Sequence, residues 1–320
     1  MSDGPHDKPA LSVVTPAFRE TDNLPVLYEK LVEVCDATGM SWEWIIVDDH
    51  SPDDTYQAIR ALSLRDSRVR GLRLARNCGS HTALGCGLYW ARGDAVVALA
   101  GDLQDPPETI PTLLAEWRDG AQVVWAARAE REGERASTLL AAGVYYWIMR
   151  SVVGLRDIPS TGADFMLLDR AVVDAFNEFK ETTVSVLALI TWLGFEQRTI
   201  EYTKVARLHG RSGWSFRKRV QLLMDSVTSF SYAPIRWISY AGVLLSLVGF
   251  LYASVVVVNA FMGSPVPGWT SLMVVVLVIG GVQMLMIGAL GFYVWRALDE
   301  ARARPRFVVE KSTFDARTVR

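Results

Sequence analysis

Residues 95–107 read AVVALAGDLQDPP, an apolar run of strand length that ends in acidic and turn-forming residues. The apolar part predicts a strand over Ala95–Leu99. Ligands of parallel sheets bind beyond the carboxyl ends of the strands, so the loop of residues 100–106 is a candidate ligand-binding loop.

Outward from this segment, short apolar runs alternate with longer amphipathic runs over residues 10–127. The other predicted strands are Ala10–Thr15, Trp44–Val47, Val69–Leu74 and Ala121–Ala127. Helices are predicted at Asp22–Thr38, Asp53–Leu64, Thr82–Arg92 and Pro107–Asp119, with Asp22 and Asp53 as N-caps. This alternation indicates right-handed crossovers and a mainly parallel sheet, the α/β class.

Two further loops follow strands at the same edge of the predicted sheet, Pro16–Asn23 and Asp48–Asp53. In Asp48–Ser51 a carboxylate can accept from a ribose hydroxyl or a base N–H, but a capped turn explains the same residues. The sequence contains neither GxGxxG nor GxxxxGK(S/T), so a dinucleotide fingerprint and a P-loop are not supported.

The loop after Leu99 offers ligands for a cation. In an extended loop, Asp102 and Gln104 point to the same side, as oxygen ligands of Mg²⁺ or Mn²⁺ would. Asp105 before Pro106 is explained equally well as a cap of the helix that follows.

Composition excludes several classes of protein. The 320 residues carry 33 Lys and Arg against 35 Asp and Glu, a net charge of −2, so no nucleic-acid partner is expected. Half of the residues are hydrophobic and 21% are charged, which excludes a largely disordered chain and points to a membrane segment. The polar Met1–Ala10 segment predicts no signal peptide.

The excess hydrophobicity lies in Trp237–Phe261 and Ser271–Trp295, each of 25 residues without Asp, Glu, Lys or Arg. A helix of that length measures about 37 Å, enough to cross a hydrocarbon core of about 30 Å. The loop between the spans is uncharged, whereas arginines flank the outer ends: Arg236, Arg296, Arg302, Arg304 and Arg306. The positive-inside rule then predicts a multi-pass protein of the cell (inner) membrane with both termini in the cytoplasm.

Four motifs occur in the order of a known family: Thr15–Glu20 with Asn23-Leu24, Val47–Ser51, Arg76–Gly79, and Asp102–Glu108. They resemble glycosyltransferase family 2, and more narrowly the polyprenyl-phosphate glycosyltransferases, the group of dolichol-phosphate mannose synthase and the bacterial undecaprenyl-phosphate glucosyltransferases. With the C-terminal hairpin, the resemblance covers nearly the whole chain. It implies a GT-A fold (Rossmann-like) followed by a two-helix transmembrane hairpin, a nucleotide-sugar donor and a divalent metal, Mg²⁺ or Mn²⁺.

The resemblance also assigns roles to single residues. It places four residues around the nucleotide: Pro16, Phe18, Glu20 and Asp49. It places Asp102 and Gln104 at the metal and the donor diphosphate. Arg128 matches a basic position near the donor and Asp164 an acidic position near the reacting sugar, so the catalytic candidates are Asp102, Asp164 and Arg128.

Two positions depart from the family pattern. The family usually has Asp-x-Asp where this chain has Ala100-Gly101-Asp102, so one carboxylate near the metal is missing. His50 replaces a usual glycine and is expected to adopt the left-handed conformation as a structural residue.

Residues 202–224 carry six Lys and Arg and no Asp or Glu, and their apolar residues recur at helical spacing. This predicts a basic amphipathic helix on the membrane surface. General attraction to anionic lipid explains the charge. The more specific alternative is that these basic residues and a neighbouring hydroxyl bind the phosphate of a lipid acceptor. The candidate residues are Arg207, Arg211, Ser212 and Lys218.

The predicted organisation is a GT-A catalytic domain (1–210), the basic helix (211–234), two transmembrane helices (235–296) and a cytoplasmic tail (297–320). The predicted function is an inverting hexosyltransferase of cell envelope glycosylation, which moves one sugar from a UDP- or GDP-sugar to undecaprenyl or dolichyl phosphate at the lipid bilayer. Family analogy suggests a homo-oligomer, with a tetramer as one form. The alternatives are a non-catalytic nucleotide- or lipid-binding scaffold and a processive polysaccharide synthase, although the Gln-x-x-Arg-Trp motif of such synthases is absent.

Overall fold

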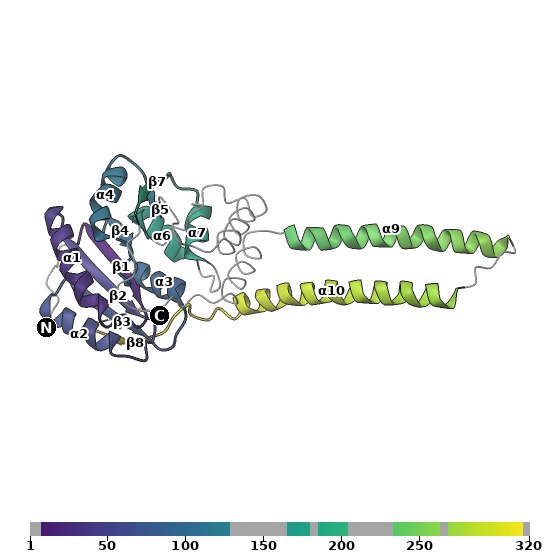
Figure 1. Cartoon of the computed structure of the whole chain (residues 1–320), viewed down its shortest axis with the longest axis horizontal. Coiled ribbons are helices and arrows are strands. Elements are labelled where there is room, and N and C mark those ends of the chain that lie inside the picture. Colours follow the sequence, from purple (N-terminus) through teal and green to yellow (C-terminus); the bar gives the residue numbers. More distant parts are fainter. Residues whose placement is uncertain (1–7, 129–164, 180–184, 204–232, 263–267, 316–320) are drawn as a thin grey trace. The chain divides into compact units, whose positions relative to one another are not determined.

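The computed structural model describes residues 8–128, 165–179, 185–203, 233–262 and 268–315. The chain divides into two compact units, one formed by Met1–Ser226 with Pro305–Arg320 and the other by Val227–Arg304. The described part of the first unit is built around an eight-stranded sheet, and that of the second is a pair of long helices (Figure 1).

The sheet has the strand order β7-β5-β6-β4-β1-β2-β3-β8. Four of its seven neighbouring pairs are parallel and three are antiparallel. The strands are Leu11–Ala17 (β1), Trp42–Asp48 (β2), Val69–Leu74 (β3), Ala95–Ala98 (β4), Val123–Arg128 (β5), Phe165–Asp169 (β6), Gln197–Tyr202 (β7) and Val309–Ser312 (β8). The predicted mainly parallel α/β sheet is confirmed.

Helices cover both faces of the sheet, which is why the central strands β1, β2 and β4 are buried almost throughout (Figure 1). One face carries α1 (Asn23–Ala37), α2 (Thr55–Arg65) and α4 (Ile110–Arg118), the last preceded by a 3-10 turn at Pro107–Thr109. The other carries α3 (Ser80–Trp90), α6 (Arg170–Glu178) and α7 (Val186–Trp192).

The nine elements predicted between residues 10 and 127 are present, each within two residues of its expected bounds when the 3-10 turn Pro107–Thr109 is counted with α4. The predicted N-caps need correction. Asp22 stands at the N-cap of α1, but among the described residues its side chain makes no capping hydrogen bond. The N-cap of α2 is Asp54, while Oδ1 of Asp53 accepts from the Thr55 amide at 3.3 Å.

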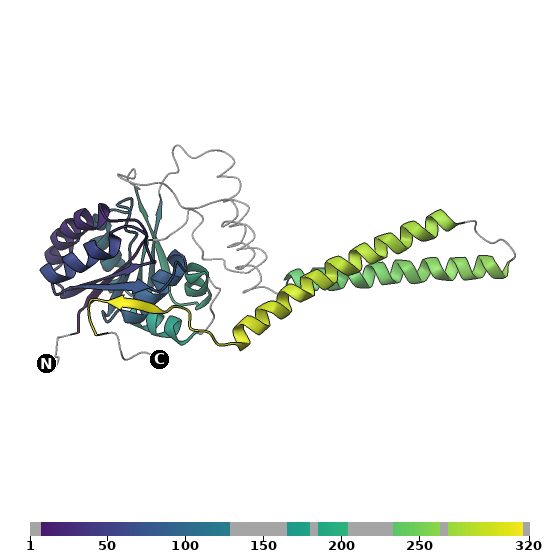
Figure 2. The ribbon, with the colours of Figure 1, turned by 90° about the horizontal axis from the view of Figure 1, so that it is seen from below.

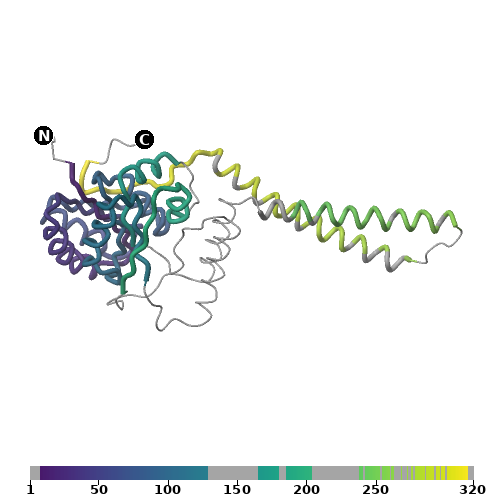
Figure 3. Tube along the Cα trace, turned by 90° about the horizontal axis from the view of Figure 1, so that it is seen from above, coloured from purple at the N-terminus to yellow at the C-terminus, as the bar shows by residue number. Residues whose placement is uncertain are grey.

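The second unit contains α9 (Ala233–Phe261) and α10 (Trp269–Ala301), of 29 and 33 residues. Each has a 22-residue segment apolar enough to cross a membrane, with mean hydropathies of 2.4 and 1.7. The traces of α9 and α10 form a helical pair (Figure 3). A Cβ atom on Gly242 of α9 would lie 2.8 Å from Cε of Met286 on α10, so the glycine permits a close approach of the two helices. The predicted pair of apolar C-terminal helices is thus present, judged by length and composition.

The strand β8 lies in the segment 297–320, for which the sequence predicts only a tail. It pairs antiparallel with β3 and forms the edge of the sheet in the first unit (Figure 2).

Candidate active site

The loops after β1 and β4 meet at the carboxyl edge of the sheet. A Cβ atom on Gly101 would lie 3.4 Å from Cγ2 of Thr15 and 3.4 Å from Cγ of Glu20, so the Asp102 loop packs directly on the end of β1. The neighbouring positions of β1 and β4 in the sheet bring these loops together, as the strand-edge rule predicts.

Three of the predicted nucleotide contacts lie at the end of β1 and in the loop that follows it. Pro16 lies within β1, and the ring of Phe18 is 42% exposed at the loop surface. Arg19 adopts a left-handed conformation with φ of 61°, and its amide donates to Oγ of Ser51 at 3.0 Å. Oε2 of Glu20 accepts from the side-chain amide of Asn23 at 2.6 Å. The loop is therefore tied to the turn after β2, and the Arg19 guanidinium lies over the partly exposed Phe18 ring, 5.4 Å from its centre.

Asp48 holds the turn after β2 and is fully buried. Its Oδ2 accepts from Nη1 of Arg73 at 2.8 Å, and its Oδ1 accepts from the Ser51 amide at 2.9 Å. His50, between them, has a φ of 56°, the left-handed conformation expected for it. For Asp48, then, the capped turn is the better description.

Asp49 joins the turn after β2 to the start of α3. Its Oδ1 accepts from the Cys78 amide at 2.6 Å and its Oδ2 from the Gly79 amide at 2.8 Å. Burial raises the pKa of Asp49, although these two backbone hydrogen bonds act in the opposite direction. A carboxylate has about four acceptor sites, so Asp49 can still receive a base or ribose donor.

The loop after β4 is not extended, which corrects the geometry expected for Asp102 and Gln104. Leu103 between them has a φ of 59°, and Oδ1 of Asp102 accepts from the Gln104 amide at 3.2 Å. This local hydrogen bond closes a turn. The expectation that Asp102 and Gln104 point to the same side, which holds for an extended chain, therefore does not apply to this loop. Asp102 is 8% exposed.

Arg128, at the end of β5, lies opposite Tyr202 of β7. The Tyr202 hydroxyl donates to Oδ1 of the buried Asp105, in the loop that also carries Asp102. Burial and the charge of Asp105 raise the pKa of Tyr202, while the hydrogen-bonded Arg128 acts in the opposite direction. The structure thus brings Arg128 to the Asp102 loop. The contact between Tyr202 and Asp105 was not predicted from the sequence, because it depends on the β5–β7 register.

Several predicted site residues lie outside the described residues, together with most of the basic juxtamembrane segment: Asp164, Arg207, Arg211, Ser212 and Lys218. Their roles stay predictions.

The residues that the structure describes contain no group of three or more His, Cys, Asp and Glu side chains that could hold a metal by themselves. Asp102 and Gln104 supply two oxygen-bearing side chains in one turn, and Mg²⁺ or Mn²⁺ commonly complete their shells with water and substrate phosphates. This donor set fits a cation that binds together with a diphosphate.

The acidic turn of Asp102, the basic strand end at Arg128 and the partly exposed Phe18 thus lie at the carboxyl edge of a mainly parallel sheet. Residues 12–176 match the model of glycosyl transferase family 2. The chain belongs to this family, which confirms the predictions of a GT-A fold, of a glycosyltransferase and of nucleotide-sugar use.

Two relatives are similar to this protein over nearly the whole chain. The "uncharacterized glycosyltransferase YkcC" of Bacillus subtilis (strain 168) is 37% identical over 302 residues, 94% of this chain and 93% of that protein. The bactoprenol glucosyl transferase of Shigella phage SfII is 33% identical over 303 residues, 94% of this chain and 98% of that protein. Among solved structures, mannosyl-3-phosphoglycerate synthase from Rubrobacter xylanophilus is 16% identical with a TM-score of 0.48, covering 73% of this chain and 75% of that chain.

Proposed function

We propose that this protein transfers one sugar from a UDP- or GDP-sugar to a polyprenyl phosphate at the cytoplasmic face of a membrane, with inversion at the anomeric carbon. The observation that carries the proposal is the packing of the Asp102 loop against Glu20 and beside Arg128, in a chain that also has two long apolar helices. The name of the phage relative, a bactoprenol glucosyl transferase, supports a polyprenyl acceptor.

The donor diphosphate would lie at the Asp102 loop. Asp102 and Gln104 would hold Mg²⁺ or Mn²⁺, which neutralises negative charge on a leaving diphosphate. Arg128, placed beside this loop through Tyr202 and Asp105, adds a fixed positive charge for the same leaving group. Phe18 offers its exposed ring to the base, and Asp49 offers its remaining acceptor sites to the nucleoside.

In the transfer step, an oxygen of the lipid phosphate attacks the anomeric carbon, and the bond from that carbon to the nucleotide phosphate oxygen breaks on the opposite face. The lipid phosphate is already anionic near neutral pH, so no strong general base is required. Asp164 orients the sugar or stabilises positive charge on it. The acceptor phosphate is bound by the basic segment, through Arg207, Arg211, Ser212 and Lys218. Alignment of the two substrates is the main contribution to the rate.

The apolar helices explain why a soluble fold would act on a lipid. Lengths of 29 and 33 residues suffice to cross a bilayer, and arginines flank the outer ends of the pair. The proposal therefore includes a multi-pass protein of the inner membrane with both termini in the cytoplasm, and a homo-oligomer formed through the helical hairpin.

The test compares Asp102→Asn with a matched control, Asp174→Asn, whose carboxylate is 63% exposed and pairs with Arg170. Release of nucleoside diphosphate is measured with a nucleotide sugar and polyprenyl phosphate in detergent. Asp102→Asn should lower turnover by about 100-fold or more at unchanged melting temperature, and the control should match the wild type. Near-normal turnover of Asp102→Asn would refute the assigned role. Release of nucleoside diphosphate that does not depend on the lipid would refute a polyprenyl phosphate acceptor. Absence of release would favour the alternative of a non-catalytic scaffold. A polymeric product would favour the alternative of a processive polysaccharide synthase.

A further inference from the structure

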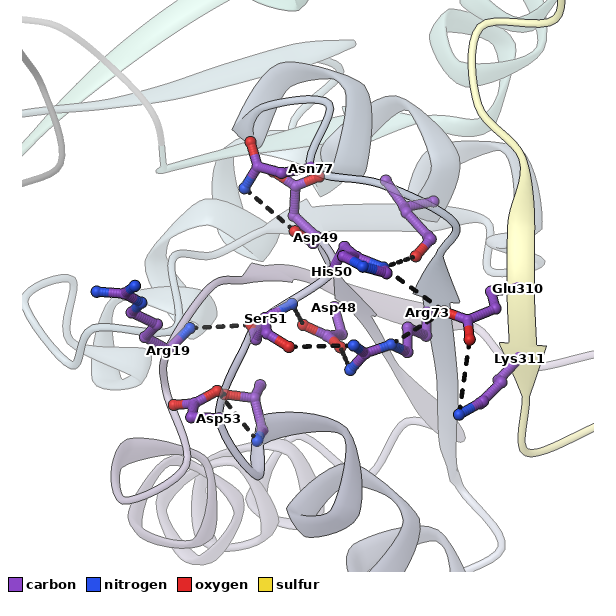
Figure 4. A network of polar contacts seen from close by, with 12 residues as sticks. Arg19, Asp48, Asp49, His50, Ser51, Asp53, Arg73, Asn77, Glu310 and Lys311 are labelled. Carbon is purple, nitrogen blue, oxygen red and sulfur yellow. Dashed lines mark hydrogen bonds and ion pairs between the residues drawn. The ribbon is translucent and has the colours of Figure 1, made fainter.

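The strand β8 meets β3 with an irregular register. Lys311 lies opposite Arg73 and Val309 opposite Leu74, so Glu310 is the extra residue of a β-bulge. Bulges re-aim side chains, and here Glu310 points toward the end of β2 and the turn that follows it (Figure 4).

Residues beyond β8 anchor the strand firmly to the sheet. The Gly71 amide donates to Oγ1 of Thr313 at 2.8 Å, and the Thr313 amide donates to the Gly71 carbonyl at 2.9 Å. The Phe314 ring packs edge-on against Trp90, with the Arg70 guanidinium 4.0 Å from its centre. The segment is therefore a fixed part of the first unit, and its side chains have defined positions.

Glu310 contacts Arg73 of β3 and His50 in the turn after β2. Its Oε2 accepts from Nε of Arg73 at 3.2 Å and lies 3.5 Å from Nδ1 of His50. That Nδ1 also lies 3.0 Å from the Leu74 carbonyl oxygen. Because both partners of Nδ1 are acceptors, the proton of the His50 ring belongs on this nitrogen. Partial desolvation raises the pKa of Glu310, but the hydrogen bond from Arg73 and the charge of Lys311 outweigh it, so the net pKa lies below its ordinary value.

Arg73 passes this contact on to the turn after β2. Its Nη1 donates to Oδ2 of Asp48 at 2.8 Å and its Nη2 to the Ser51 carbonyl at 3.1 Å, so acceptors on three sides fix the plane of the guanidinium (Figure 4). The Ser51 hydroxyl in turn accepts from the Arg19 amide in the loop after β1. A continuous set of hydrogen bonds thus runs from β8 to both nucleotide loops.

We propose that Glu310 is a positioning residue for the donor site: through Arg73 and His50 it fixes the turn Asp48–Ser51, and with it the place of Asp49 and of the loop that carries Phe18. The segment that follows the apolar hairpin in sequence then completes the pocket for a nucleoside diphosphate. The identity of the ligand rests on the proposed function; the ordering of the turn does not.

The test uses the full-length protein in detergent and the variant Glu310→Gln. The matched control is Glu29→Gln, since Glu29 forms an exposed ion pair with Arg65 at 2.8 Å on the helices α1 and α2. Hydrogen exchange of amides 48–51 reports on the turn without any ligand. Titration with UDP and GDP gives Kd, and donor kinetics give KM and kcat separately.

We expect Glu310→Gln to speed exchange of the Ser51 amide and to leave kcat unchanged. The variant should raise Kd and the donor KM about three- to ten-fold, because it loses one partly exposed charged hydrogen bond. The control should change none of these. A merely structural role would lower the melting temperature and the active fraction without raising KM.

Unchanged exchange in Glu310→Gln, or faster exchange with unchanged Kd and KM, would overturn the inference. If the wild type binds neither nucleotide, the proposed function fails, and the exchange data alone decide whether Glu310 orders the turn.

Discussion

Replacing Arg73 by methionine removes a guanidinium that hydrogen-bonds to Asp48 and keeps most of the aliphatic stem. The Asp48 side chain is 0% exposed and that of Arg73 is 15% exposed. Truncating one partner of a buried ion pair costs about 3–5 kcal/mol, because the remaining charge stays desolvated. The Ser51 amide still donates to Asp48 at 2.9 Å. We therefore expect the lower end of the range, a loss of about 3 kcal/mol in the free energy of unfolding.

The matched control is Arg65→Met. Nη1 of Arg65 lies 2.8 Å from Oε1 of Glu29, the same separation as in the Arg73–Asp48 pair, but both side chains are 61% exposed. Exposed ion pairs contribute about 0.2–1 kcal/mol. Arg65→Met also removes the contact of the Arg65 guanidinium with the Tyr28 ring, so the expected loss in the free energy of unfolding is about 1 kcal/mol.

Thermal unfolding of the full-length protein, followed by tryptophan fluorescence, distinguishes the two variants. A loss of 1 kcal/mol shifts Tm by about 2–4 °C in a domain of 150–250 residues. Arg73→Met should therefore lower Tm by about 6–12 °C and Arg65→Met by about 2–4 °C. Equal shifts in Tm would refute the reasoning, because the two ion pairs have the same N–O distance and differ in burial.

Three further predictions concern single residues. Iodoacetamide at pH 8 should label the partly exposed Cys78 before Cys35, because burial raises the pKa of the Cys35 thiol to about 12; peptide mass spectrometry showing Cys35 labelled first would contradict this. Gly93→Ala should cost about 3 kcal/mol or more in urea unfolding, because its Cβ would lie 2.5 Å from a backbone nitrogen of β1; a near-native midpoint would contradict it. Burial raises the pKa of Asp66, but hydrogen bonds from Arg68 outweigh this effect, so the net pKa is lowered. The contribution of the Asp66–Arg68 pair to the free energy of unfolding is therefore complete above the unfolded pKa of about 3.9 and is lost as pH falls through the lower pKa of the folded protein. Arg68→Met should accordingly destabilise the fold more at pH 7 than at pH 3, as measured by urea unfolding at the two pH values, and an equal loss at both would count against the pair.

The sequence was sufficient for the order of strands and helices between residues 10 and 127, because apolar periodicity and glycine or proline breaks are local signals. The left-handed conformation of His50 was also predictable, since it stands where the family has glycine. These features depend on a residue and its near neighbours.

Features that depend on pairing between distant segments were not predictable. The strand Val309–Ser312 is only four residues long, and its partner β3 lies more than 230 residues earlier in the chain. Tyr202 reaches Asp105 only because β7 pairs with β5 in one register. The turn at Leu103 arises from a side-chain hydrogen bond that competes with the extended backbone.

The central claim is transfer of one sugar to a membrane-bound phosphate. The most direct measurement incubates the purified protein, in bilayer discs containing undecaprenyl phosphate, with UDP- and GDP-sugars and identifies the lipid by mass spectrometry. We expect a polyprenyl monophosphate that carries a single sugar, with one nucleoside diphosphate released per product. Transfer to a water-soluble phosphate in discs without the polyprenol, or an unmodified lipid with every donor, would contradict the account.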